Sequence, residues 1–208
     1  MRKPSQVKAV LFDLGNVLVD FDHTIAAKRI SCFCDKTPKE IFDLFFASQI
    51  TTKFEAGKIS SLDFFKEVKK SLNANISYES FVPIWNEIFF LSLKNRQVYS
   101  LANKLRDNYL VALLSNINVL HYEYLKSKFP VFNVFHNVFT SCELGFVKPD
   151  EEIYRKVIKE LGVGAEDIFY TDDRIELIES AKKIGLRSFV FKDVFQLRAD
   201  LESQGVSI

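Results

Sequence analysis

Residues 8–22 read KAVLFDLGNVLVDFD, and this stretch points most directly to the fold. The apolar run from Ala9 to Phe12 leads to one acidic residue, Asp13, in a turn that contains Gly15. A short β-prone run that ends in a turn is typical of a buried strand. Open α/β sheets bind ligands just outside the carboxyl ends of their strands. We therefore expect Asp13 to lie where such a fold carries out its chemistry.

From residue 94 onward, patterns typical of strands and helices alternate. Helices are expected at 94–106, 119–128, 151–161 and 175–184, with a last helix near the end, and strands at 109–114, 137–140, 168–171 and 188–191. Strands separated by helices form parallel sheets with right-handed crossovers. Residues 7–12 supply a further strand. The pattern predicts an α/β fold with a Rossmann-like parallel sheet flanked by helices.

Residues 23–91 interrupt this alternation. Four helices are expected there, with no strand between them, at 26–33, 38–47, 62–72 and 78–90. Thr37 followed by Pro38 is a typical helix start, with a cap residue and then Pro at the first helical position. We predict a core made of residues 1–19 and 92–208, with residues 20–91 inserted as an all-α cap.

Composition narrows the classes of partner and compartment. The chain has 208 residues, with 28 Lys and Arg against 27 Asp and Glu and a net charge of +1. This balance gives no electrostatic reason to expect a nucleic acid or a membrane surface as partner. The chain has three cysteines, and this odd count does not favour a disulfide framework. We therefore expect the protein to be in a reducing cytoplasm. The most apolar later run, residues 88–93, is far too short to span a bilayer. The sequence leaves the oligomeric state open.

Four short polar signals follow strands or begin helices: Asp13-Leu-Gly15-Asn16, Ser115-Asn116, Lys148-Pro149 and Asp172-Asp173. Each alone is common as a turn or a helix start. Their order and spacing together resemble the four motifs of the haloacid dehalogenase-like (HAD) superfamily, over essentially the whole chain. The inserted helical block resembles the cap of subfamily I. The DLGNV, Ser-Asn and Asp-Asp forms are similar to the branch that includes glucose-1-phosphate phosphatases.

This resemblance implies a Mg²⁺-dependent phosphatase for a small phosphorylated metabolite, with a sugar phosphate favoured. Asp13 would be the nucleophile and would form a phosphoryl-aspartate. The metal would be bound by Asp13, by the backbone carbonyl of Gly15 and by Asp173, with Asp172 an outer or water-mediated partner. The residues implied to bind the phosphate are Gly15, Asn16, Ser115, Asn116 and Lys148.

Gly15 leaves three interpretations open. Most phosphatases of the superfamily carry a second Asp at this position, which serves as general acid and base, and Gly cannot transfer a proton. The chain is then a phosphatase with another proton donor, or a catalytically impaired module that binds phosphate ligands or a protein. The third interpretation, haloacid dehalogenation, conflicts with the retained pair Asp172-Asp173.

Two further features bear on the missing proton donor and on the substrate. Asp20 and Asp22 are possible substitutes for the acid, although Asp22 also suits the cap of a helix near Thr24. The segment 49–58, expected to be a loop between two cap helices, is a candidate substrate contact through Glu55 and Lys58. We expect His23, His121 and His136 to serve packing or the surface rather than chemistry.

Overall fold

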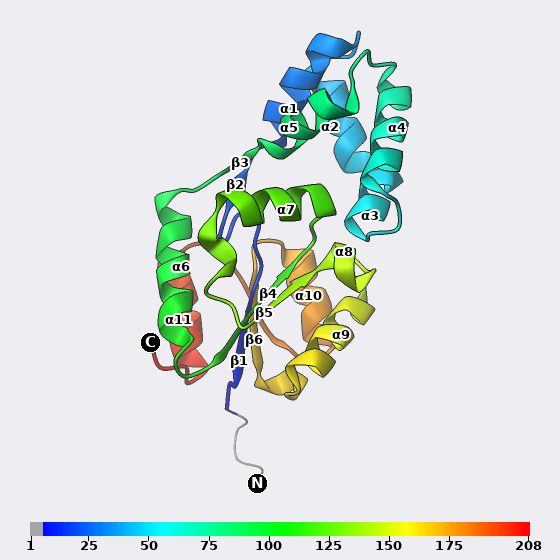
Figure 1. Ribbon diagram of the computed structural model, residues 1–208. Coiled ribbons are helices and arrows are strands. Elements are labelled where there is room, and N and C mark those ends of the chain that lie inside the picture. Colours follow the sequence, from blue (N-terminus) through cyan, green and yellow to red (C-terminus); the bar gives the residue numbers. More distant parts are fainter. Residues whose placement is uncertain (1–5) are drawn as a thin grey trace.

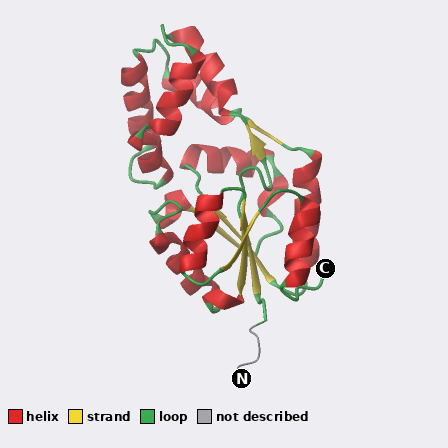
Figure 2. Ribbon diagram, turned by 180° about the vertical axis from the view of Figure 1, so that it is seen from behind, coloured by secondary structure: helices red, strands yellow, loops and turns green. Residues whose placement is uncertain are grey.

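The computed structural model describes residues 6–208, apart from the side chains of residues 46 and 47. Within this range, five parallel strands form the central sheet in the order β5-β4-β1-β6-β7 (Figures 1 and 2). Their bounds are β1 Ala9–Phe12, β4 Leu110–Ser115, β5 Asn137–Thr140, β6 Ile168–Asp172 and β7 Arg187–Val190. The predicted α/β fold class is confirmed. Residues 1–5 of the predicted core lie outside the described residues.

The first strand, β1, lies in the middle of the sheet. Its two neighbours, β4 and β6, follow it much later in the chain. Phe12 pairs with Leu113 of β4 on one side and with Thr171 of β6 on the other. Parallel register brings the carboxyl ends of these strands to one edge of the sheet. The turn after β1, the end of β4 and the end of β6 therefore lie side by side.

Helices cover both faces of the sheet (Figure 1). Alternate residues of β1 point to opposite faces, so Val10 and Phe12 join one apolar cluster while Ala9 and Leu11 join the other. The first cluster includes residues of α6 Leu93–Leu105, α7 Val119–Lys128 and α11 Val194–Ser203. The second includes residues of α9 Glu151–Leu161 and α10 Ile175–Lys183. The short elements are α8 Ser141–Leu144 and the 3-10 turns η1 Ser31–Phe33, η2 Pro130–Phe132 and η3 Ala165–Asp167.

Five helices lie together above the carboxyl ends of the strands (Figure 1). They are α1 His23–Ile30, α2 Pro38–Ala47, α3 Gln49–Glu55, α4 Ser61–Leu72 and α5 Tyr78–Asn86, and we call them the helical cluster. They share an apolar core of their own, in which the rings of Phe54 and Phe64 stack at 4.3 Å. This separate core supports an inserted unit, while the predicted boundaries at 19/20 and 91/92 stay predictions.

Three sequence-based expectations for this region are wrong. Residues 23–91 are not free of strand, because β3 Phe89–Phe90 pairs antiparallel with β2 Asp20–Phe21. The helix expected over 78–90 ends at Asn86, since the carbonyl of Ile88 accepts a hydrogen bond from the Asp22 N–H instead of one in the helix. The segment 49–58 is not a loop, because α3 occupies residues 49–55. The β2–β3 ribbon thus joins the helical cluster to the sheet.

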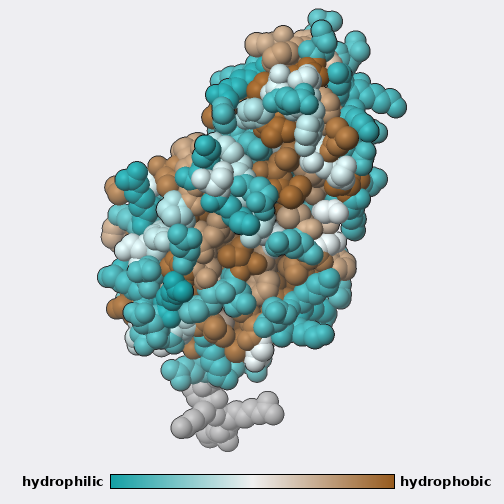
Figure 3. Space-filling view, viewed as in Figure 1, coloured by the Kyte–Doolittle hydropathy of each residue, from teal (hydrophilic) through white to brown (hydrophobic). Residues whose placement is uncertain are grey.

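The helices of the described part of the chain were compared with what a bilayer-spanning helix requires. No helix there is both long enough and apolar enough to cross a membrane. On the face seen in Figure 3, hydrophilic residues surround smaller hydrophobic patches on both the helical cluster and the part that contains the sheet.

Candidate active site

A cavity of about 180 Å³ lies where the carboxyl ends of β1, β4 and β6 face the helical cluster. The eight residues singled out from the sequence all line it: Asp13, Gly15, Asn16, Ser115, Asn116, Lys148, Asp172 and Asp173. They come from four separate segments. The parallel register brings the ends of β1, β4 and β6 together, and Lys148 joins them through its ion pairs with Asp13 and Asp172. Their individual roles stay predictions.

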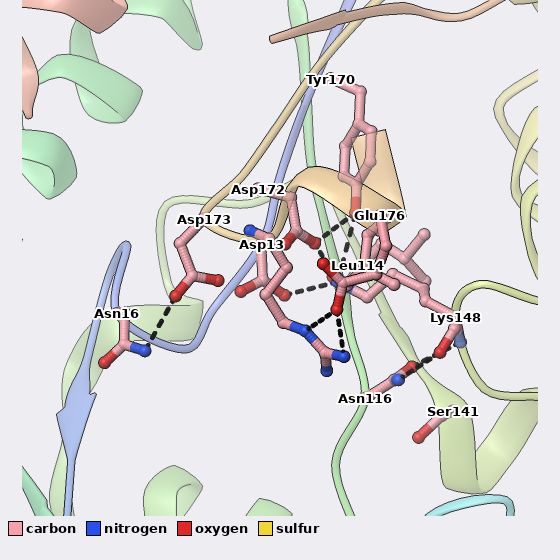
Figure 4. A network of polar contacts seen from close by, with 12 residues as sticks. Asp13, Asn16, Leu114, Asn116, Ser141, Lys148, Tyr170, Asp172, Asp173 and Glu176 are labelled. Carbon is pink, nitrogen blue, oxygen red and sulfur yellow. Dashed lines mark hydrogen bonds and ion pairs between the residues drawn. The ribbon is translucent and has the colours of Figure 1, made fainter. Parts of the chain in front are cut away.

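Lys148 is at the centre of the polar network (Figure 4). Its Nζ lies 2.6 Å from Asp13 Oδ1 and 2.6 Å from Asp172 Oδ2, and its side chain is almost completely buried. The same Nζ donates to the carbonyl of Leu114 at 3.1 Å. A buried ammonium between two carboxylates holds both in fixed positions. Lys148 therefore orients Asp13 while cancelling part of its charge.

Burial and charge act in opposite directions in this network. Burial alone would lower the pKa of Lys148, but the carboxylates of Asp13 and Asp172 outweigh it and raise that pKa above the ordinary lysine value. Burial likewise opposes ionisation of Asp172, yet the charge and hydrogen bond of Lys148 hold its pKa below the usual range. Lys148 and Asp172 thus form a charged pair at neutral pH.

Two asparagines fix the loops around this network. The side chain of Asn116 donates to the Lys148 carbonyl at 2.8 Å and accepts from the Lys148 N–H at 2.7 Å. Asn16 has a φ of 56°, in the left-handed region that Asn tolerates better than most residues. This conformation lets its Nδ2 donate to Asp173 Oδ2 at 2.9 Å. Both asparagines therefore position the charged residues through hydrogen bonds.

The three aspartates form a group with the composition of a magnesium site. One carboxylate oxygen from each of Asp13, Asp172 and Asp173 lies within 4.8 Å of the others. Mg²⁺ prefers hard oxygen ligands and usually takes only one or two carboxylates, keeping several waters. The donor set and its spacing fit that ion.

The ring of Phe21 lies close to the backbone of Gly15. A Cβ placed on Gly15 would lie 2.8 Å from Phe21 Cε1, closer than real Cβ contacts. Phe21 belongs to the β2–β3 ribbon and packs edge-on against His23 and Phe89. The ring of Phe21 thus occupies the space next to Gly15.

Sequence reasoning did not place any histidine in the cavity, yet His23 and His121 both line it. His121 Nε2 lies 3.0 Å from the Trp85 carbonyl and therefore carries the proton, while Nδ1 accepts from the Asn118 side chain. Burial lowers the pKa of His121 to about 3 and that of His23 to about 4, so both rings are neutral. Neither has a sequence signal, because their neighbours here come from distant segments. His121 links α7 to α5 of the helical cluster.

The two acids considered as substitute proton donors have other partners. Asp22 caps α1 by accepting from the Thr24 N–H at 2.8 Å. Asp20 forms an ion pair with Lys94 at 2.8 Å and accepts from Asn95 at 3.1 Å. Neither is among the residues that line the cavity. Both carboxylates hold the entry to the helical cluster in place.

The helical cluster is fixed to the core at the end of α3. Ser141 Oγ in α8 donates to the carbonyl of Glu55 at 2.6 Å. Two residues further on, Gly57 has a φ of +65° and passes so close to α8 that a Cβ would lie 2.2 Å from the Cys142 carbonyl oxygen. Only glycine fits this approach. The contact brings Glu55 to the cavity.

We expect Gly57→Ala to disturb this contact and to lower kcat/KM of the phosphatase reaction that the sequence predicts by about tenfold. Misplacement of a reacting group by about 1 Å costs up to about 10²-fold in rate. The added methyl would overlap the Cys142 carbonyl and push α3 away from the core. Steady-state kinetics measures the effect. Gly162→Ala is the matched control, because Gly162 has a φ of +67° and open space around it. Equal kinetics for the two variants would exclude a role for the Gly57 contact.

Comparison with known proteins adds independent information. A family model described as haloacid dehalogenase-like hydrolase matches residues 7–185. The chain is 26% identical over 189 residues to D-ribitol-5-phosphate phosphatase of Bacteroides thetaiotaomicron, covering 88% of this chain and 91% of that protein. It is 27% identical over 188 residues to drimenol cyclase drtB of Aspergillus calidoustus, covering 89% of this chain but only 34% of that longer protein.

A solved structure is also similar. It is a HAD family enzyme of Bacteroides thetaiotaomicron in complex with magnesium and inorganic phosphate, with a TM-score of 0.78 and 26% sequence identity. The match covers 90% of this chain and 96% of that one.

Proposed function

Because the chain belongs to the haloacid dehalogenase-like hydrolase family, we propose that it is a Mg²⁺-dependent phosphatase for small phosphorylated substrates. The observation that carries the proposal is the position of Lys148, 2.6 Å from both Asp13 and Asp172 beside the third carboxylate, Asp173. A nucleophilic carboxylate must approach a dianionic phosphate, and fixed positive charge at that point lowers the repulsion. The Mg²⁺ and phosphate in a similar enzyme support the same assignment.

In the proposed reaction, Asp13 attacks phosphorus through a carboxylate oxygen and forms a phosphoryl-aspartate. Lys148 holds the other Asp13 oxygen, so the attacking atom is oriented before the substrate arrives. Ser115 ends β4 and Asn116 follows it at the cavity, where the Ser115 hydroxyl and the Asn116 N–H would bind the phosphoryl oxygens. Gly15 and Asn16, in the turn after β1, would bind the same phosphate.

The metal would be held by Asp13, Asp173 and the Gly15 carbonyl. Asp172, which forms an ion pair with Lys148, would be an outer partner that does not bind the metal directly. When bound, Mg²⁺ supplies positive charge that neutralises the phosphate and orients in-line attack. The helical cluster would act as a cap that excludes water.

Among small substrates, we favour a sugar or alditol phosphate. A cavity of about 180 Å³ suits a phosphate ester with a small leaving group, and one relative acts on ribitol 5-phosphate. The three free cysteines favour a reducing compartment such as the cytoplasm.

A phosphate-release screen tests the proposal. The panel contains sugar phosphates, ribitol 5-phosphate and 4-nitrophenyl phosphate, each with Mg²⁺ and with a chelator. We expect Mg²⁺-dependent release from at least one of them. No release from any compound, with thermal stabilisation by the same compounds retained, would instead identify a binding module.

We expect Mg²⁺ alone to raise the melting temperature. At ten times its Kd, a ligand that binds only the folded chain adds about 1.4 kcal/mol, which corresponds to ~3–6 °C in a chain of this size. Asp173→Asn should remove most of this rise, because it removes a charged ligand. Asp193→Asn serves as control, since Asp193 caps α11 and Asn caps equally well. Equal Mg²⁺ shifts in both variants would contradict the assignment of Asp173.

A further inference from the structure

The proposed reaction needs a proton donor that the residues assigned so far do not provide. When the bond from phosphorus to the leaving oxygen breaks, that oxygen takes the electron pair and, in an alkyl ester, needs a proton. Asp13 is committed as the nucleophile. Position 15 carries no side chain, and the ring of Phe21 fills the adjacent space.

Most titratable groups that line the cavity are already committed. Lys148 is held by Asp13 and Asp172, and His121 uses both ring nitrogens in hydrogen bonds. Burial keeps His23 neutral, because it lowers the pKa of its ring to about 4. Among the described residues that line the cavity, Glu55 is the one carboxyl outside the group of three aspartates.

The position of Glu55 is fixed by contacts with the core. Its carbonyl accepts from Ser141 Oγ at 2.6 Å, the neighbouring Phe54 is buried, and Gly57 lies against Cys142. Within the described residues its carboxyl makes no hydrogen bond or ion pair. The group is therefore held at the cavity and is not engaged elsewhere.

Its surroundings make both protonation states accessible. Burial raises the pKa of the Glu55 carboxyl to about 7, against the opposing positive charges of Arg174 and Lys148. A group with a pKa near the working pH is suited to donate and then accept a proton.

We propose that Glu55 is the catalytic acid and base of this site, an inference that rests on the proposed phosphatase function. In the first step, an Asp13 oxygen bonds to phosphorus, the ester P–O bond breaks, and the leaving oxygen takes the Glu55 proton to give the free alcohol. In the second step, the Glu55 carboxylate takes a proton from water as that water attacks phosphorus. The bond to Asp13 then breaks, Asp13 regains its carboxylate, and inorganic phosphate leaves.

The arrangement has a consequence for closure of the cap. Asp13 and Lys148 belong to the core, whereas Glu55 belongs to α3 of the helical cluster. The site therefore contains its proton-transfer group only when the helical cluster is docked on α8.

The test compares two esters that differ in their need for an acid. 4-Nitrophenolate is a weak base and leaves without a proton, while phenolate from phenyl phosphate is as basic as tyrosinate. We expect Glu55→Gln to lower kcat/KM for phenyl phosphate by about 10²-fold and to change the value for 4-nitrophenyl phosphate far less. An equal fall for both esters, or no fall for phenyl phosphate, would overturn the proposal.

Further variants separate this role from structural effects and from the proposed function. Glu87→Gln is the matched control, since Glu87 pairs with Arg29 and does not line the cavity. Loss of 4-nitrophenyl phosphate hydrolysis in Asp13→Asn establishes the phosphatase independently of Glu55. If neither ester is hydrolysed in an Asp13-dependent way, the proposed function itself fails.

Discussion

An Asp13→Asn variant is expected to lose phosphate release by at least about 10³-fold with every substrate. The amide has almost the size of the carboxylate, so the change removes charge and nucleophilicity with little change in shape. An amide oxygen does not attack phosphorus at a useful rate. The measurement is the initial rate of phosphate release from 4-nitrophenyl phosphate at saturating Mg²⁺.

Asp22→Asn is the control for this variant. It makes the same chemical change nearby, but Asp22 only caps α1, and Asn is an equally good cap. Its rate should stay close to that of the unmodified protein. An Asp13→Asn rate within about tenfold of the unmodified rate would contradict a nucleophilic role, because loss of a nucleophile costs far more.

Replacing Lys148 by Met is expected to affect both activity and folding. The variant leaves the carboxylates of Asp13 and Asp172 buried without the ammonium that lies 2.6 Å from each. Breaking a buried pair by removing one partner typically costs about 3–5 kcal/mol. Activity should fall by at least about 10²-fold, since loss of a single fixed donor to the reacting groups costs about 10²–10³-fold.

Stability is measured by denaturant unfolding in the presence of a chelator, so that Mg²⁺ does not replace the missing charge. Lys39→Met is the matched control, because Lys39 forms an ion pair of 3.0 Å with Asp43 in which both side chains are exposed. Exposed pairs contribute little to stability. If both variants lose the same small amount of free energy, Lys148 does not have the role assigned to it.

Much of the fold was predictable because its signals are local. The alternation of apolar runs with amphipathic stretches indicated all five strands of the sheet, and the predicted helices 119–128 and 151–161 coincide with α7 and α9. The differences lie mainly at element ends, such as β6, which extends through Asp172. End residues depend on hydrogen bonds to neighbouring strands that a local pattern does not contain.

The missed elements depend on tertiary contacts. The strands β2 and β3 have two residues each, too few for a periodic pattern, and they pair across almost 70 intervening positions. Helix α3 begins at Gln49, and the side chain of its N-cap residue Ser48 makes no cap hydrogen bond, so its start lacks the usual signal. Its sequence QITTKFE also contains residues of low helix propensity.

The site was predictable where a motif marks a strand end and not where distant segments meet. Asp13, Ser115, Lys148 and Asp172 stand at recognisable positions, and the structure brings them to one cavity. Nothing near His121 in the sequence indicates its bond to the Trp85 carbonyl. The closeness of Phe21 to Gly15 likewise exists only after the β2–β3 ribbon forms.

If Asp13 accepts the phosphoryl group, mass spectrometry of the acid-quenched protein will detect the phosphoryl-aspartate. The protein is mixed with 4-nitrophenyl phosphate and Mg²⁺, quenched within the first turnover, digested and analysed. We expect one phosphoryl group on the peptide that contains Asp13, removed by hydroxylamine and absent from Asp13→Asn. A phosphoryl group on any other residue, or turnover that persists in Asp13→Asn, would contradict it.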